Sequence, residues 1–395
     1  MTTDIPAGYK LTEVGVIPGD WDVVALGDLG LCLIGLNYKP SNVKQHGTLV
    51  LRSSNVQDGV IALDDCVYVD AEIPERIRVQ DGDILICVRN GSRALIGKCT
   101  VLDQRVVGQT FGAFMSVFRT SDSAFIFQQF NSNLIKRQIN ENIGATINQI
   151  TNANLNAFLV PLPRDQGDRN AIATALSDVD ALLARLDALI AKKRDLKQAA
   201  MQQLLTGQTR LPGFSSAWEM KQFSEICHMK SGEGITSADI DDHSKFPCYG
   251  GNGLRGYTAR YTHAGSYALI GRQGALCGNV QSVNGEFFAS EHAIVVTPLN
   301  ETDIHWLAAI LKRMNLNQYS ESSAQPGLSV SRLLAFSLDV PPFEEQTAIA
   351  TILSDMDAEL AALQTRRDKT HALKQGMMQA LLTGRIRLVP TTPQP

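Results

Sequence analysis

Two stretches of the chain, residues 172–207 and 349–384, carry apolar residues at gaps that alternate between four and three. This spacing places the apolar side chains along one side of an α-helix. Neither interior contains proline, and each stretch ends on a glycine, Gly207 or Gly384, suited to the left-handed conformation beyond a helix terminus. The pattern predicts two helices of about 53 Å each, at a rise of roughly 1.5 Å per residue. The apolar seam consists of Ile172, Leu176, Val179, Leu183, Leu186 and Ile190 in the first stretch and Ile349, Leu353, Met356, Leu360 and Leu363 in the second.

The two stretches are copies of one sequence. They align without a gap and pair the Leu-Ser-Asp of residues 176–178 with that of residues 353–355. A narrow apolar seam of this length needs a cover, and each copy can cover the other. We therefore predict an antiparallel pair of helices with one globular body at each end. Periodicity alone favours a generic helical repeat or a dimeric coiled coil, but the relation of the repeat to the rest of the sequence argues against both.

The repeated unit is larger than the helix. The tryptophan-anchored segment 21–29 recurs as 218–226, each time after a proline-glycine turn. Residues 82–89 and 265–272 both read as a turn that feeds a buried strand ending on an arginine, followed by a polar loop with glycine. A loop rich in glycine and aromatic residues at 246–262 has no counterpart in the first body. A shared framework with unlike loops indicates two recognition modules built on one scaffold.

Composition narrows the class of protein. The chain has 395 residues, 44% of them hydrophobic and 19% charged, so it can hold two or three packed domains. Its net charge of −4 argues against an isolated high-affinity nucleic-acid binder, although partner subunits could supply positive charge. The seven cysteines form no C-x-x-C pair and are expected to be buried side chains rather than disulfides or zinc ligands. With neither a signal sequence nor a membrane span, we expect a cytoplasmic protein without membrane contact.

The motifs of the obvious catalytic alternatives are incomplete. An adenine methyltransferase carries Asn or Asp before a Pro-Pro-aromatic motif, but the Pro-Pro-Phe at 341–343 follows Val340, and no glycine-rich cofactor loop is present. No G-x-x-x-x-G-K-[ST] phosphate loop occurs. The Glu-Met-Lys at 219–221 matches half of a nuclease metal motif, but the corresponding segment 22–24 lacks the lysine. The histidines lack metal-ligand spacing. The residues therefore give no support for methyl transfer, ATP use or metal-dependent cleavage by this chain.

Several motifs resemble those of one family, the specificity subunit of type I restriction-modification systems, and the resemblance covers the whole chain. The strongest are the P-P-x-x-E-Q-x-A-I-A start of the second helix at 341–350 and the L-K-Q-x-x-x-Q-x-L-L-T-G end of both helices. The opening segment 9–18 with Trp21 and the Gly-Asp-Ile-Leu at 82–85 support it. The first helix departs at its start, because residues 161–169 are three residues longer than their counterpart and lack the Glu-Gln pair.

The resemblance implies an α+β fold in which two mixed α/β target-recognition domains are separated by two long antiparallel helices, with the whole plan internally duplicated. Each recognition domain would read one half of a gapped site in double-stranded DNA, and the helices would fix the gap. Two modification subunits carrying S-adenosylmethionine would dock along the helices, and restriction subunits, which use ATP and Mg²⁺, would join outside them. The chain itself would catalyse nothing. The expected boundaries are 1–160 and 209–340 for the recognition domains, 161–208 and 341–389 for the spacer helices, and 390–395 for a disordered tail.

The recognition loops are expected to present polar side chains to base edges in the major groove, where all four base pairs differ in their donors and acceptors. A strand-end arginine such as Arg89 or Arg272 could equally cap its strand or pair with a carboxylate. Two other classes are a catalytic protein with coiled-coil spacers and a helical scaffold or adaptor without DNA readout; the divergent polar loops argue against the second. The candidate DNA-binding residues are Arg89, Asn90, Arg93 and Lys98 in the first body and Asn252, Arg255, Arg272, Gln273 and Asn279 in the second.

Overall fold

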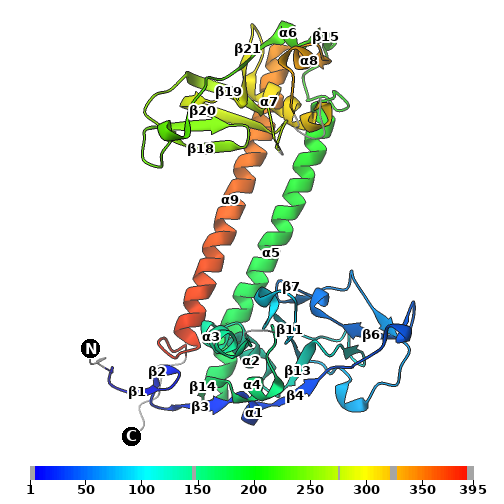
Figure 1. The fold of residues 1–395 in the computed structure, drawn as a ribbon, viewed down its shortest axis with the longest axis vertical. Helices are drawn as coiled ribbons and strands as arrows, with labels where there is room; N and C mark the ends of the chain where they lie inside the picture. The colour runs from blue at the N-terminus through cyan, green and yellow to red at the C-terminus, as the bar shows by residue number, and fades with distance from the viewer. Residues whose placement is uncertain (1–4, 145–147, 275, 321–326, 389–395) are drawn as a thin grey trace. The chain divides into compact units, whose positions relative to one another are not determined.

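Two compact units divide the protein, whose structure is a computed structural model. Unit 1 combines residues 1–185 with 367–395, and unit 2 comprises residues 186–366. Both boundaries fall within the long helices α5 (Gln166–Leu204) and α9 (Phe343–Leu381), so each unit contains part of both helices (Figure 1). The structure describes residues 5–144, 148–274, 276–320 and 327–388, and the predicted tail 390–395 lies outside them.

Body 1, the part of unit 1 that precedes α5, is a mixed α and β structure. Its strands are β1 (Tyr9–Thr12), β2 (Gly15–Pro18), β3 (Trp21–Ala25), β4 (Leu31–Ile34), β5 (Val43–Lys44), β6 (Thr48–Leu51), β7 (Val56–Gln57), β8 (Val60–Ile61), β9 (Tyr68–Val69), β10 (Ile84–Cys87), β11 (Cys99–Val101), β12 (Thr110–Phe111), β13 (Met115–Arg119) and β14 (Leu159–Pro163). Its α-helices are α1 (Leu26–Leu29), α2 (Ser123–Phe130), α3 (Asn133–Asn142) and α4 (Asn152–Ala157).

Two four-stranded sheets organise body 1, in the orders β11-β10-β13-β4 and β12-β6-β9-β5. The central strand β10 is apolar on both faces, and the period of two along a strand sends its side chains into two different cores. Ile84 and Ile86 join the cluster that includes the helices, whereas Leu85 and Cys87 join the cluster of the second sheet. This burial on both faces explains why the predicted strand at 82–89 reads as a continuous apolar run.

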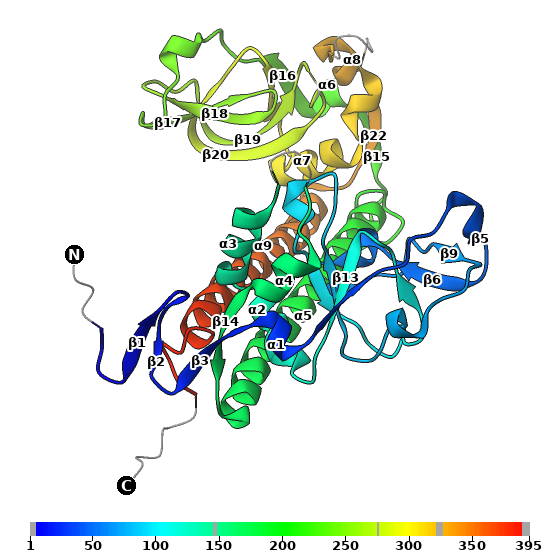
Figure 2. The same cartoon turned by 60° about the horizontal axis from the view of Figure 1, so that its bottom comes forward.

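Body 2, residues 209–342, repeats this plan with one larger sheet. Its strands are β15 (Glu219–Gln222), β16 (Cys227–Ser231), β17 (Phe246–Gly250), β18 (Gly253–Thr258), β19 (His263–Gly271), β20 (Val280–Ala289), β21 (Ala293–Pro298) and β22 (Ser337–Val340), and its α-helices are α6 (Phe223–Ile226), α7 (Ile304–Arg313) and α8 (Val330–Leu334). The main sheet has the order β16-β21-β19-β20-β17-β18, and α7 covers one of its faces (Figure 2). Trp306 of α7 is fully buried there.

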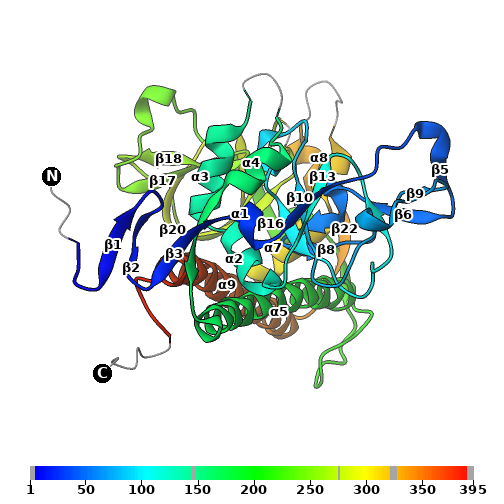
Figure 3. The same cartoon turned by 90° about the horizontal axis from the view of Figure 1, so that it is seen from below.

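The two predicted helices are present and lie side by side (Figure 3), and the contacts within each unit confirm that they are antiparallel. Each has 39 residues, or about 58 Å at a rise of roughly 1.5 Å. In unit 1, Leu176 of α5 shares an apolar cluster with Met378 of α9. In unit 2, Leu204 of α5 shares one with Leu353 of α9. Each body therefore encloses one end of each helix in its own core.

Matched ion pairs accompany the seam. Asp180 pairs with Lys374 in unit 1, and Lys197 pairs with Asp357 in unit 2. Asp180 and Asp357 are the same position of the internal repeat, and so are Lys197 and Lys374. The helix pair thus repeats its polar contacts with the roles of α5 and α9 exchanged.

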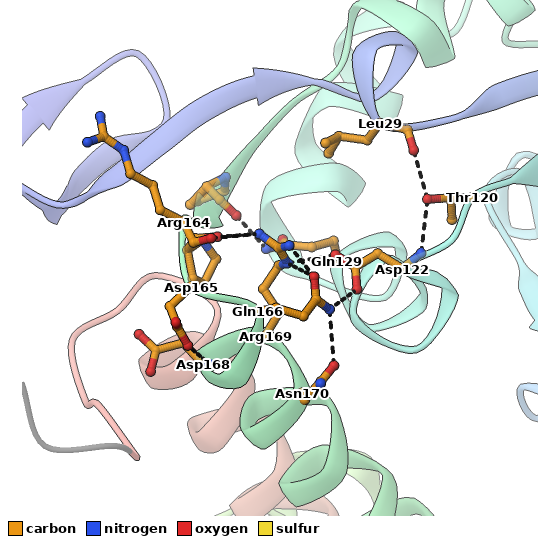
Figure 4. Close-up of polar contacts among 12 residues, drawn as sticks. Leu29, Thr120, Asp122, Gln129, Arg164, Asp165, Gln166, Asp168, Arg169 and Asn170 are labelled. Carbon is orange, nitrogen blue, oxygen red and sulfur yellow. Dashed lines mark hydrogen bonds and ion pairs between the residues drawn. The ribbon is translucent and has the colours of Figure 1, made fainter.

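The start of α5 is tied to body 1 through Asp122, the residue before α2 (Figure 4). The guanidinium of Arg169 lies 2.7 Å from a carboxylate oxygen of Asp122, and it also donates to the carbonyl of Pro163 at 2.7 Å. The side chain of Asp165 accepts a hydrogen bond from the N–H of Asp168 at 3.1 Å and so satisfies a free donor of the first turn. Body 1 and the first turn of α5 are therefore connected by charged and neutral hydrogen bonds.

The expected three-residue extension before the first helix is wrong. Strand β14 ends at Pro163 and α5 begins at Gln166, whereas β22 ends at Val340 and α9 begins at Phe343, so two residues connect strand and helix in both cases. Pro161 and Pro163, which the sequence comparison placed in the extension, lie within β14, which pairs with β3. Gln346 holds the repeat position of Arg169, and its amide nitrogen donates to the carbonyl of Pro341 at 2.9 Å, as Arg169 donates to that of Arg164 at 3.3 Å.

The ends of the helices confirm the predicted glycines and show what the arginines that follow them contact. Gly207 and Gly384 have φ values of 68° and 70°, in the left-handed region. Arg210 and Arg387 follow these glycines, where a cation would favour the partial negative charge at the C-terminus of its own helix. Instead, each pairs with a carboxylate in the first turn of the other helix, which offers a full charge rather than a partial one.

Candidate nucleic-acid interface

Arg89 and Asn90 follow β10 and begin an exposed loop of body 1. Arg89 forms an isolated antiparallel bridge with Gln149, and its guanidinium carbon lies 4.9 Å from the ring centre of Phe114. Within the described part of the chain, this guanidinium has no hydrogen bond or ion pair. Asn90 is more constrained, because its amide donates to the hydroxyl of Ser53 at 3.1 Å. Arg89 is therefore an available cation, while Asn90 shapes the loop.

Arg93 and Lys98 lie farther along the same loop and contact neutral groups. Arg93 donates to the carbonyl of Asn140 at 3.2 Å, and the ammonium of Lys98 lies 3.4 Å from the amide oxygen of Gln57. The carbonyl of Lys98 accepts from the N–H of Cys87 at 2.8 Å. The structure thus brings Arg89, Asn90 and Lys98 together at the end of β10.

Arg272 and Gln273 follow the corresponding strand, β19, in body 2. Arg272 is half-buried and donates to the hydroxyl of Ser231 at 3.0 Å. The structural role that the sequence left open for this arginine is therefore filled, although by a hydroxyl and not by a carboxylate. Gln273 is exposed, and its backbone forms an isolated antiparallel bridge with Gly327. The side-chain amide of Gln273 has no hydrogen bond to another described residue. Gln273 is therefore the more available of the two.

Asn252 lies at the exposed tip of the β17–β18 hairpin, which approaches the end of β19. The preceding residue, Gly251, lies so close that a Cβ atom on it would be 3.1 Å from the carbonyl oxygen of His292 and 3.3 Å from that of Gln273. Only a residue without a side chain fits this contact without displacing its neighbours. The hairpin tip and Gln273 therefore form one polar surface.

Arg255 and Asn279 flank this surface. Arg255 is exposed on β18, and its stem covers Gly250. Asn279 is exposed, and its carbonyl accepts from the N–H of Gly271 at 2.8 Å. All five candidates of body 2 thus lie near the end of β19 or on the adjacent hairpin.

The predicted correspondence between the two strand ends is wrong by one residue. Cys87 and Gly271 hold equivalent positions, because each pairs with the first residue of the neighbouring strand, β13 or β21, and each accepts at 2.8 Å from the glycine N–H of the loop that follows. Arg89 therefore corresponds to Gln273 and not to Arg272. The sequence comparison matched the arginines, whereas strand register is set by pairing with neighbours that are distant in sequence.

Two residues of this surface escaped the sequence reading. Phe114 is 57% exposed and stacks against Arg89. His292 is its counterpart in body 2. The carbonyl of Phe114 accepts from the N–H of Val88 at 3.1 Å, and that of His292 from the N–H of Arg272 at 2.9 Å. The available signal was an exposed side chain directly before an apolar strand in both bodies.

Other chemistry is not evident in the part of the chain that the structure describes. No group of three or more histidine, cysteine or carboxylate side chains there could hold a metal ion, and no helix there is long and apolar enough to span a membrane. All seven cysteines are free thiols. Burial raises the pKa of Cys99 and of Cys227 to about 12, so both stay protonated and poorly nucleophilic near neutral pH.

Two copies of one α+β scaffold, each presenting a different polar loop at the end of its central strand, define a two-module binding protein. Comparison with known proteins identifies the family. The model of the type I restriction modification DNA specificity domain matches residues 18–192 and 215–370, most of the chain. The chain belongs to this family.

Curated relatives and solved structures agree with this assignment. The chain is 38% identical to the type I restriction enzyme EcoprrI specificity subunit of Escherichia coli over 216 residues, which cover 51% of this chain and 52% of that protein. It is 27% identical to the EcoKI specificity subunit of Escherichia coli K12 over 196 residues, 47% of this chain and 41% of that protein. The chain thus spans about half the length of the curated relatives it matches. The type I restriction-modification S subunit from M. genitalium has the same fold, with a TM-score of 0.65 at 19% identity over 94% of this chain and 98% of that one.

Proposed function

We propose that the chain is the DNA-recognition subunit of a type I restriction-modification complex. In this proposal body 1 and body 2 each read one half of a gapped site in double-stranded DNA, and the paired helices set the length of the gap. The observation that carries the proposal is the repeated scaffold: both bodies present an exposed polar loop at the end of an equivalent strand, but the side chains differ. Identical loops would suit a symmetric site, whereas unlike loops suit two different half-sites.

The chemistry of the two loops supports DNA as the ligand. Arginine, lysine, asparagine and glutamine provide the donors and acceptors that distinguish base edges in the major groove. The proposed DNA-binding residues are Arg89, Asn90, Arg93 and Lys98 in body 1 and Asn252, Arg255, Arg272, Gln273 and Asn279 in body 2. Arg272 has the weakest case, because Ser231 already holds its guanidinium.

The remaining components belong to partner subunits in this proposal. Two modification subunits with S-adenosylmethionine dock along α5 and α9, and restriction subunits that use ATP and Mg²⁺ join outside them, in the cytoplasm. The chain selects DNA and catalyses nothing. Its net charge of −4 supports this division, because a subunit that bound DNA alone would need its own excess of cations.

Grafting tests the proposal. Residues 31–155 are replaced by the corresponding body of another family member, and the chain is assembled with its modification subunits for methylation-site mapping. We expect one half of the methylated sequence to change and the other half to remain, because body 1 is an independent module. Simultaneous change of both halves would contradict the modular function. A helical adaptor without DNA readout would instead leave the methylated sequence unaffected by the graft.

A further inference from the structure

Arg89 of body 1 and Gln273 of body 2 hold the same position of the shared scaffold. Each lies two residues beyond the end of its central strand, β10 or β19. Each backbone is fixed by an isolated antiparallel bridge, to Gln149 in body 1 and to Gly327 in body 2. The segments that supply these bridges lead into α4 and α8, respectively. The scaffold therefore presents one equivalent position in each body, with a different side chain.

Arg89 differs from most arginines of body 1 in having no carboxylate partner. Six others form ion pairs, namely Arg52 with Asp65, Arg78 with Glu75, Arg105 with Asp103, Arg119 with Asp83, Arg137 with Glu141 and Arg164 with Asp22. Arg89 instead stacks on the exposed ring of Phe114, whose carbonyl accepts from the N–H of Arg89 at 3.1 Å. This contact orients the planar guanidinium and leaves its donors unused among the described residues. Such a group is suited to a planar acceptor pair.

Gln273 has the neutral equivalent of this arrangement. Its side chain is exposed and makes no hydrogen bond to another described residue, while its carbonyl is packed against Gly251 of the hairpin. The neighbouring His292 lies 3.2 Å from Glu291 rather than on Gln273. A free glutamine amide offers one donor and one acceptor side by side. Both positions thus carry a planar group with two adjacent hydrogen-bonding atoms.

We propose that Arg89 and Gln273 are matched base-reading residues that select guanine in one half-site and adenine in the other. The fork of Arg89 fits the O6 and N7 acceptors of guanine, and the amide of Gln273 fits the N7 acceptor and N6 donor of adenine in the major groove. This inference rests on the proposed DNA-recognition function and adds the base that each body reads.

The pairing of an arginine with a glutamine favours base contact over phosphate contact. A phosphate offers only acceptors to the protein, so it would leave the acceptor oxygen of a glutamine amide unused. What Arg89 and Gln273 share is the capacity for two parallel hydrogen bonds to one flat partner. A base edge is the part of DNA that offers such a partner.

Exchange of the two side chains tests this inference. Three proteins are compared: the unsubstituted full chain and the variants Arg89→Gln and Gln273→Arg. Each is assembled with the modification subunits and incubated at fixed salt with a library of duplexes of random sequence. Bound duplexes are then sequenced. In Arg89→Gln we expect one guanine of one half-site to become adenine, with a change in preference of roughly 5- to 150-fold. In Gln273→Arg we expect the reverse change at one position of the other half-site.

Arg105→Gln is the matched control, since Arg105 is an exposed arginine of the same body that Asp103 holds at 2.8 Å. It should leave the enriched sequence unchanged. The unaltered half-site in each variant shows that the protein is folded and bound. The inference is overturned if Arg89→Gln enriches the original sequence, or if it weakens all duplexes alike and lowers the salt slope by about one, as loss of a phosphate contact does. Failure of the unsubstituted chain to enrich any sequence would overturn the proposed function instead.

Discussion

In both units an arginine that follows one long helix pairs with a carboxylate in the first turn of the other helix, and we call this ion pair the joint of the unit. The carboxylate is an aspartate in unit 1 and a glutamate in unit 2. In unit 1, Arg387 follows α9 and lies 2.6 Å from Asp168 in the first turn of α5. In unit 2, Arg210 follows α5 and lies 2.7 Å from Glu345 in the first turn of α9. The two pairs hold matched positions of the internal repeat. The joint is therefore the same in plan, and its strength depends on which acid is present.

The joint of unit 2 is the more complete. Glu345 is fully buried, and its two oxygens accept hydrogen bonds from Arg210, both at 2.7 Å. One of these oxygens also accepts from the indole N–H of Trp218 at 3.1 Å. Both oxygens of the buried carboxylate thus accept hydrogen bonds, and these bonds offset the cost of removing the charge from water.

The joint of unit 1 is shorter by one methylene group. Asp168 binds Arg387, but the indole N–H of Trp21, the counterpart of Trp218, is buried without a partner among the described residues. Asp20 lies 2.8 Å from Arg387 and supplies a second, more exposed contact. The comparison shows that the repeat retains the place of the joint while its hydrogen bonds are redistributed.

The two bodies show the same division between a fixed and a variable part. The order β11-β10-β13-β4 of body 1 is the order β20-β19-β21-β16 of body 2. In body 2 the continuous ten-residue strand β20 carries β17 in parallel at its far end. In body 1 the corresponding strand is interrupted by residues 102–109. Its first part is β11, and its second part, β12, pairs in parallel with β6 in a separate sheet. The order of these four strands is retained, and the part of the sheet beyond them differs.

The largest expected effect comes from removing the carboxylate of unit 2. Glu345→Ala leaves the guanidinium of Arg210 and the indole N–H of Trp218 without their acceptor, and we expect a loss of about 3 kcal/mol in the free energy of unfolding, the low end for breaking a buried pair. Urea unfolding with hydrogen exchange across body 2 measures it. Glu344→Ala, at an exposed position of the same turn, is the control and should change little. Equal losses in the two variants would contradict the argument.

A smaller effect is expected from exchanging the two acids. Asp168→Glu should allow the carboxylate to reach the indole N–H of Trp21 and stabilise unit 1 by about 1 kcal/mol, because a buried donor gains its acceptor. Glu345→Asp should lose the contact with Trp218 and destabilise unit 2 by about 1 kcal/mol. Fluorescence of the tryptophans and hydrogen exchange of each unit measure the two shifts. Shifts of the same sign would show that chain length does not explain the difference.

The sequence predicted the helices because their signals are local. The alternating gaps from Ile172 to Ile190 and the glycines at 207 and 384 act over a few residues, and the structure reproduces both. The duplication followed from the same repeat, whereas the α+β class was implied by the resemblance to a known family. The candidate loops were located because glycine and polar residues interrupt the apolar strands.

The contacts that complete the structure were not predictable in the same way. Arg210 and Glu345 are 135 residues apart, and Arg387 and Asp168 are 219 apart, so no local pattern connects them. The correspondence of Arg89 with Gln273 also required strand register, which depends on neighbours elsewhere in the sheet.

The smallest expected effect is a difference between the two bodies in how their stability depends on pH. His263 begins β19, whose nine residues exceed the four of β10, and it stacks on Phe287 with ring centres 5.5 Å apart. Burial lowers the pKa of His263 below its ordinary value of 6.5; the nearby Glu233 raises it and Lys230 lowers it by smaller amounts. Below pH 6.5 the unfolded chain therefore binds more protons at this position than the folded chain does. Body 2 should lose stability as the pH falls through this range.

Hydrogen exchange at pH 7.5 and 5.5, corrected for the intrinsic rate, measures this loss. We expect the strands around His263 to lose protection at the lower pH relative to body 1, which serves as an internal reference. The variant His263→Phe keeps an aromatic ring against Phe287 and removes the titrating group, so the difference between the two pH values should shrink. An unchanged difference in His263→Phe would assign the acid sensitivity of body 2 to other groups and remove this histidine from the comparison.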